Sequence, residues 1–166
     1  MEVDMLSESQ QRRVWEGMLG GEIRACYFAD LSGRLNSRQR WAIWAVLIFS
    51  SGATAAVLAS LPPDWLWLRF VLPLLAAAVS LYSVVMQNQK FAVDASDLHA
   101  RWNRLAKDYE AIWENIYADD AIDRLKELDE RATELSKVGA ASFRYNKRAM
   151  LKWENHVVEH RLAHAA

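Results

Sequence analysis

Two long apolar segments dominate the pattern of hydrophobic and polar positions along the chain. Residues 41–61 and 70–86 contain no Asp, Glu, Lys or Arg. Each segment approaches the roughly 20 residues that an α-helix needs to cross the hydrocarbon core of a bilayer. Between them, Pro62-Pro63-Asp64 stops a helix and reverses the chain. We therefore predict a transmembrane hairpin over residues 41–86, with spans at about 41–61 and 66–86 and a turn at 62–65.

Tryptophan and basic residues mark the ends of the predicted spans. Indole rings favour the headgroup layer of a bilayer, and they stand at the start of each span as Trp41, Trp44, Trp65 and Trp67. Basic residues gather on the side away from the turn: Arg24, Arg34, Arg38, Arg40, Lys90, Arg101, Arg104 and Lys107. The positive-inside rule then places both termini on the cytoplasmic side of the membrane and the turn outside. The alternative is a buried hairpin in a soluble bundle, but a chain of 166 residues would struggle to cover two apolar helices.

The segment before the hairpin, residues 1–40, has helical periodicity. Its apolar positions are Val14, Trp15, Met18, Leu19, Ile23, Cys26, Tyr27, Leu31 and Leu35. Gly20-Gly21 predicts a break into a short amphipathic helix and a second helix that runs into the first span. The apolar face can pack on the C-terminal helices or lie in the membrane surface.

A heptad pattern follows the second span, in the predicted cytoplasmic helical domain of residues 87–166. Steps of four and three separate Phe91, Ala95, Leu98, Trp102, Leu105, Tyr109, Ile112 and Ile116. Such a seam packs along another helix, either within one chain or as an assembly seam between copies. Asp119 and Asp120 predict a cap for a new helix, Val138-Gly139 predicts its end, and a last helix is expected over about 141–162. No segment alternates like a strand, so the predicted fold is all-α: a transmembrane hairpin with a cytoplasmic helical, coiled-coil module.

One side of the second span is small or polar. Arg69, Pro73, Ala76, Ser80, Ser83 and Gln87 recur in helical steps and share a face. Close helix packing is one interpretation, with Ser51, Gly52, Ala55, Ala56 and Ala59 as the matching residues of the first span. The other is that Arg69, Ala76, Ser80, Ser83 and Gln87 line a pore, which requires a homo-oligomer because one hairpin cannot enclose a path.

The sequence contains no phosphate loop, nucleophile elbow or paired-acid arrangement, so we predict no enzyme and no cofactor. His156 and His160 share a helix face with His164 beyond them, but the pattern lacks the glutamate of a helical zinc site, and we predict no metal. Cys26, the only cysteine, is interpreted as a packed small residue in a reducing compartment. The net charge of −1 predicts no direct binding of nucleic acid.

A basic cluster is the one polar feature that suggests a ligand. It consists of Arg144, Lys147, Arg148 and Lys152, with Tyr145 and Trp153 nearby. It is either a solvated helix face or a site for a phosphate, a nucleotide signal or a lipid headgroup.

The architecture resembles the SLATT family, the two-transmembrane effectors associated with bacterial SMODS nucleotidyltransferases and SLOG sensors. The resemblance covers residues 23–40, the hairpin with its Pro-Pro turn, and residues 90–117 with Asp97-Leu98-His99 and Trp102-Asn103-Arg104-Leu105. It implies a pore-forming effector of an antiphage or conflict system in a bacterial inner (plasma) membrane, with a nucleotide-signalling or sensor protein as partner. It carries over no site residues.

Three functions follow as hypotheses. The first is an oligomeric pore-forming effector in the lipid bilayer, gated through its cytoplasmic helices. The second is a non-conducting anchor or scaffold that recruits a soluble partner through the heptad face. The third is a channel whose basic cluster, Arg144 to Lys152, binds a nucleotide directly.

Overall fold

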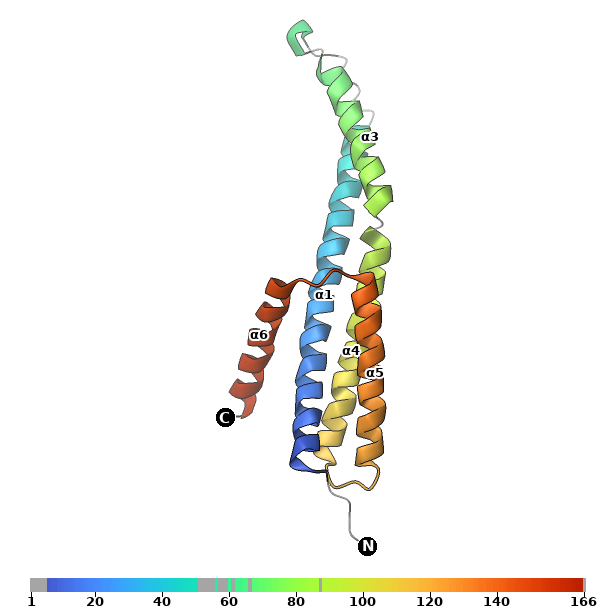
Figure 1. Ribbon diagram of the computed structural model, residues 1–166. Coiled ribbons are helices and arrows are strands. Elements are labelled where there is room, and N and C mark those ends of the chain that lie inside the picture. Colours follow the sequence, from blue (N-terminus) through green and yellow to red (C-terminus); the bar gives the residue numbers. More distant parts are fainter. Residues whose placement is uncertain are drawn as a thin grey trace. The chain divides into compact units, whose positions relative to one another are not determined.

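Helices make up the regular structure of this protein. The computed structural model describes residues 6–50, 56, 60, 62–65, 67–86 and 88–165, and no strand occurs among them. The elements are α1 (Glu8–Ser50), the 3₁₀ helix η1 (Pro63–Trp65), α3 (Leu68–Met86), α4 (Asn88–Glu114), α5 (Ala121–Ser142) and α6 (Lys147–Ala165) (Figure 1). The predicted all-α class is confirmed for these residues.

Contacts divide the chain into two units. The bundle consists of Met1–Leu31 and Asp94–Ala166, and the middle unit consists of Ser32–Val93. The bundle contains the first part of α1, most of α4, and α5 and α6. The predicted borders at residues 40/41 and 86/87 lie inside the middle unit, because residues 32–40 and 87–93 join the two apolar segments in it.

The start of α1 is fixed by side-chain caps. The backbone N–H of Gln10 donates to Oγ of Ser7 at 3.3 Å, and the Gln10 side chain accepts from the backbone N–H of Ser7 at 2.8 Å. This reciprocal pair is a capping box, which satisfies two backbone donors that the first helical turn leaves unpaired. The helix therefore begins at Glu8, next to Ser7.

α1 continues without a break through Gly20-Gly21, so the predicted division at this point is wrong. The glycines serve close packing instead. A Cβ atom at Gly21 would lie 3.0 Å from Cβ and 3.2 Å from Cα of Ala106, and one at Gly17 would lie 2.7 Å from the Tyr109 ring. Each glycine costs helix stability of about 1 kcal/mol relative to alanine, and the approach of α4 to α1 offsets that cost.

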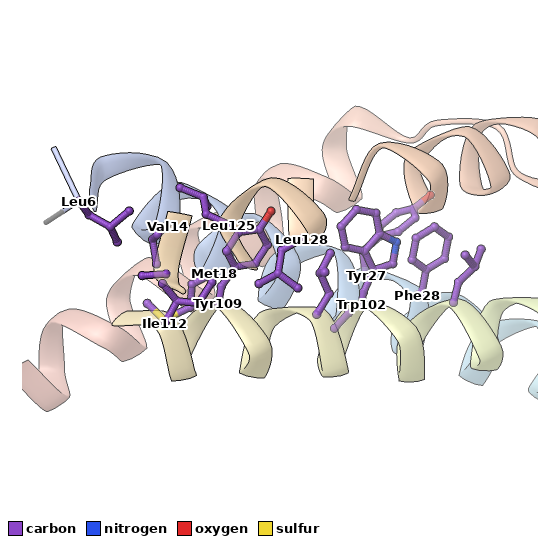
Figure 2. Packing of buried hydrophobic residues seen from close by; sticks show 14 of the residues in the cluster. Leu6, Val14, Met18, Tyr27, Phe28, Trp102, Tyr109, Ile112, Leu125 and Leu128 are labelled. Carbon is purple, nitrogen blue, oxygen red and sulfur yellow. The ribbon is translucent and has the colours of Figure 1, made fainter. Parts of the chain in front are cut away.

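The core of the bundle lies between α1, α4 and α5. Val14 and Met18 of α1 are fully buried with Tyr109 and Ile112 of α4, and Leu125 of α5 belongs to the same cluster (Figure 2). The heptad positions of α4 supply most of its side of this core, as their spacing predicts. The seam is therefore occupied within one chain, and pairing of copies through it would require the bundle to open.

Two predicted boundaries near the C-terminus are wrong. α5 passes through Val138-Gly139 and ends at Ser142, where the N–H of Phe143 donates to the carbonyl O of Gly139 at 2.9 Å. Gly139 is buried against the ring of Phe28, so it marks a close contact and not a helix end. The last helix begins at Lys147 rather than near 141. Asp120 occupies the predicted N-cap position of α5, although its side chain makes no cap hydrogen bond.

Candidate functional site

The first candidate site is the apolar surface of the middle unit. Large apolar side chains stand exposed on both of its long helices: Trp41 is 74% exposed on α1, and Phe70 and Leu74 are 79% and 71% exposed on α3. Others on the same unit are Ile43, Trp44, Leu47, Ile48, Trp65, Trp67, Leu75, Leu81 and Tyr82. An apolar surface of this kind marks a contact with lipid or with another protein. Among the residues that the structure describes, no helix combines the length and the apolar character needed to cross a membrane.

The small and polar stripe of α3 lies only in part on the covered side of the helix. Ala76 and Ser80 are half-buried, as are Val71, Leu72 and Val79, whereas Arg69 and Pro73 are exposed. Ser83 belongs to α3, but its side chain and the whole of Gln87 lie outside the described residues. Ala76 and Ser80 thus have neighbours within their own unit, as close packing requires.

Most of the predicted packing partners on the first span cannot be placed. Ser51, Gly52, Ala55 and Ala59 lie outside the described residues, and Ala56 is helical and exposed. Their predicted role in helix packing therefore stays a prediction.

The heptad seam of α4 is buried at its centre and more exposed at its two ends. Leu98, Trp102, Leu105, Tyr109 and Ile112 are buried in the bundle. Phe91 is exposed and Ile116 is half-buried. The central part of the seam therefore acts as core within the single chain.

The second candidate site is a cleft of about 420 Å³ in the bundle. α1 contributes Arg24, Tyr27 and Phe28, α4 contributes Trp102, and the segment after α5 contributes Phe143 and Tyr145. Phe28 packs against Tyr27 with ring centroids 5.2 Å apart and against Phe143 at 5.7 Å. Figure 2 shows Tyr27, Phe28 and Trp102 gathered together, at the opposite end of the core from Leu6 and Val14. Five of the fifteen residues that line the cleft are aromatic, and its size is typical of small-ligand sites.

Two polar groups of the cleft are incompletely satisfied. The Arg24 guanidinium lies 4.9 Å from the centre of the Trp102 ring and donates one hydrogen bond, 3.0 Å long, to the carbonyl O of Gly20. Burial lowers the pKa of Arg24, and within the described residues it forms no ion pair. The indole N–H of Trp102, which is 3% exposed, finds no acceptor among the described residues. An unpaired buried donor of this kind costs about 1–3 kcal/mol.

The predicted basic cluster is only partly drawn into the cleft. Arg144 lines it, whereas Lys147, Arg148 and Lys152 do not. All four side chains are exposed, and the Lys152 ammonium lies 4.9 Å from the Trp153 ring centre. The four residues therefore do not form a single site. Arg144 lines the cleft, whereas the other three lie along the first turns of α6.

The remaining titratable candidates are held in structural contacts. Cys26 is half-buried, and burial with the nearby charge of Glu22 raises the pKa of its thiol, which disfavours the reactive thiolate. His156 and His160 have ring centroids 6.5 Å apart on α6. In the described part of the chain, no three His, Cys, Asp or Glu side chains come together as metal ligands would.

The sequence does not identify Arg24, Tyr27 or Phe28 as residues of a cleft, and it predicts Trp102 only as part of the α4 seam. A signal was present, since a cation at Arg24 interrupts an apolar helical stripe and is followed three and four residues later by Tyr27 and Phe28. Trp102, by contrast, occupies a heptad position, so the sequence predicts only an ordinary core residue there.

Comparison of the chain with protein-family models, with curated proteins and with solved structures finds no match.

Proposed function

We propose that this protein is a two-transmembrane, oligomeric membrane effector that opens a pore when its cytoplasmic bundle receives a signal. Residues 41–86 would insert as a hairpin in a bacterial inner membrane, with both termini in the cytoplasm. The observation that carries the proposal is the exposed apolar surface on both long helices of the middle unit, including Trp41, Phe70 and Leu74. In water these side chains stay exposed. In a bilayer the lipid tails would cover them, at a gain of about 25 cal/mol per Å² of apolar surface removed from water.

Charge and aromatic placement support the same orientation. Arg34, Arg38 and Arg40 are exposed on α1 just before the apolar segment, and Lys90 is exposed just after α3. Exposed Trp65 and Trp67 lie at the turn end. Basic residues on one side and indoles at both ends are the distribution expected of an anchored hairpin.

A pore requires several copies. Two helices have too little surface to shield a polar path from lipid, so conduction needs an oligomer in which a polar stripe faces an axis. Ser80 and Ser83 are the candidates for that stripe, with Arg69 at its outer end. The resemblance to the SLATT effectors supports an antiphage or conflict role, with a nucleotide-signalling or sensor protein as partner.

The test is depolarisation of bacterial cells on induced expression, followed with a potential-sensitive dye. We expect the wild type to depolarise cells and the double variant Ser80→Leu, Ser83→Leu to lose this effect at equal membrane content. Ala77→Leu is the matched control, since Ala77 is exposed on the same helix. Equal depolarisation by the wild type and the double variant would contradict pore lining by these serines.

A second function, a non-conducting membrane anchor that recruits a soluble partner, is favoured by one observation. Ala76 and Ser80 are already half-buried within their own unit, so this side of α3 is partly covered in a single chain. The same assay separates the two functions. An inserted wild-type oligomer that leaves the membrane potential unchanged at every expression level would support the anchor.

A further inference from the structure

More positive than negative side chains line the aromatic cleft of the bundle. Arg24 and Arg144 line it, and Glu154 is the one acidic side chain among its lining residues. Neither arginine forms an ion pair within the described residues, and Glu154 is exposed. A half-buried guanidinium without a carboxylate is a poor arrangement for stability alone, because burial of an unpaired charge carries a desolvation cost.

The walls around these charges suit a flat ring. Tyr27, Phe28, Trp102, Phe143 and Tyr145 present aromatic surfaces to a volume of about 420 Å³. Aromatic side chains hold planar rings by offset or edge-on stacking at centroid distances of about 4.5–7 Å. Such a volume lies within the range of about 300–1,000 Å³ found for small-molecule sites.

A further donor at this place has no acceptor. The indole N–H of Trp102 is buried and unpaired among the described residues, and in Figure 2 its nitrogen lies on the side of Tyr27 and Phe28. Buried donors in native proteins nearly always have a partner, so an unpaired one beside a cleft indicates a missing acceptor. Because neighbouring side chains cover the N–H, an acceptor atom on a ligand ring would reach it once those side chains shift.

We propose that this cleft binds a small planar anion, an aromatic ring that carries one phosphate or carboxylate group. The ring stacks among Tyr27, Phe28 and Tyr145, and the acidic group pairs with Arg24 and Arg144. Charge-assisted bonds from guanidinium groups to phosphate or carboxylate are among the strongest hydrogen bonds in proteins. The site lies wholly within the bundle, so it does not depend on whether the middle unit conducts ions.

Isothermal titration calorimetry on the full chain in detergent micelles tests the proposal. The probes are 5′-AMP, an aromatic phosphate, and nicotinate, an aromatic carboxylate whose ring nitrogen can accept a hydrogen bond. Adenosine, which lacks the phosphate, and inorganic phosphate, which lacks the ring, are the partial probes. We expect at least one aromatic anion to bind with a dissociation constant of about 1 mM or tighter, and the partial probes to bind at least about tenfold more weakly. Binding of 5′-AMP alone identifies the acidic group as phosphate, and binding of nicotinate alone identifies it as carboxylate.

Two matched pairs of variants locate the site. Arg144→Met should weaken binding about tenfold, whereas Arg148→Met, an equally exposed arginine outside the cleft, should leave it unchanged. Ala140→Trp fills the cleft from an exposed position of α5 and should abolish binding, whereas Ala141→Trp beside it should not. Circular dichroism establishes that each variant keeps its helices.

The proposal is overturned if neither aromatic anion binds at about 5 mM, roughly five times the expected dissociation constant. It is also overturned if inorganic phosphate binds as tightly as 5′-AMP, or if Arg148→Met weakens binding as much as Arg144→Met. These results leave the proposed membrane function standing, just as a failure to depolarise cells would leave the ligand site standing.

Discussion

The hydroxyl group of Tyr109 in α4 donates a hydrogen bond, 2.8 Å long, to Oδ1 of Asp129 in α5. The other carboxylate oxygen of Asp129 pairs with Arg13 of α1, so one carboxylate joins three helices of the bundle. Tyr109 is 1% exposed, and its ring rests on Gly17. The bond therefore lies where α1, α4 and α5 meet.

Replacing Tyr109 with Phe should destabilise the bundle by about 2 kcal/mol, since the lost bond is buried at one end and made to a charged acceptor. The ring and its packing against Gly17 remain, so the loss isolates the hydroxyl group. The measurement is chemical unfolding in detergent, followed by circular dichroism. Tyr117→Phe is the control, because Tyr117 is exposed and its change should stay within about 0.5 kcal/mol. Equal stability of the two variants would show that the Tyr109 bond contributes nothing.

Stability should fall as the pH rises above about 10, the ordinary pKa of tyrosine. Burial, and then the hydrogen bond to Asp129, raises the pKa of Tyr109 in the folded chain. The unfolded chain thus releases the phenolic proton at a lower pH than the folded chain, and each increase in pH then favours unfolding. The contribution of the neutral phenol is complete below the unfolded pKa and is lost as the pH rises through the folded pKa.

The measurement is the unfolding midpoint in guanidinium chloride from pH 8 to pH 11. Cys26 adds a loss of the same sign, since burial also raises its pKa. Tyr109→Phe should reduce the slope above about pH 10. An unchanged slope in this variant would show that other groups govern the alkaline transition.

Two glycines of α1 should respond to alanine in opposite directions. At Gly17 the new Cβ would lie 2.7 Å from the Tyr109 ring, so α1 and α4 must separate, which costs about 1–3 kcal/mol. At Gly33 nothing lies within 4 Å of the new Cβ, so Gly33→Ala should stabilise the helix by about 1 kcal/mol through propensity alone. Thermal unfolding of the two variants makes the comparison. A stabilising Gly17→Ala would mean that the close approach of Tyr109 is not a constraint.

The same glycines show where the sequence was ambiguous. The sequence predicts a helix break at Gly20-Gly21 and a helix end at Val138-Gly139, yet both sites lie inside continuous helices. A glycine in a sequence can mark a weak point of a helix or a place where a neighbouring side chain packs closely. Here the positions of Ala106 and Phe28 show that both sites are places of close packing. Tertiary packing here overrides local propensity.

The heptad of α4 was predictable because period alone determines which of its side chains are buried together. Leu98, Leu105 and Ile112 are buried as expected, but the pattern does not say whether the partner is α1 of the same chain or a second copy. The cleft was not predictable for a related reason. Arg24, Trp102 and Arg144 come from distant parts of the sequence, and only the docking of the helices brings them together.

Arg161 should hold α6 against the rest of the bundle. Its guanidinium donates to Glu110 at 2.9 Å and to Glu22 at 3.0 Å, so it links α6 to α4 and α1. These bonds, the one to Glu110 first, raise the pKa of Arg161. Arg161→Met should weaken the docking of α6 by about 1 kcal/mol, a modest value because the side chain is partly exposed.

Hydrogen exchange of α6 amides is the measurement for this variant. We expect roughly fivefold faster exchange across Lys147–Ala165 and little change in α5. Arg12→Met is the control, because its ion pair with Glu16 lies within one helix and is well exposed. Faster α6 exchange in the control, or an unchanged exchange rate in Arg161→Met, would mean that Trp153 and Val157 hold α6 in place and that Arg161 does not.

A charge placed on the exposed apolar surface of α3 should prevent membrane insertion if lipid covers that surface. Leu74 is 71% exposed on α3. An arginine near the centre of a membrane helix costs about 2.5–3.5 kcal/mol on insertion scales, whereas leucine gains a few tenths. Leu74→Arg should therefore shift the protein from the carbonate-resistant membrane fraction to the soluble or degraded fraction.

Leu162→Arg is the matched control, since Leu162 is similarly exposed but lies on α6 in the bundle, and it should leave membrane content unchanged. Release of the wild type by carbonate, or equal retention of Leu74→Arg, would mean that a protein surface and not lipid covers this part of α3.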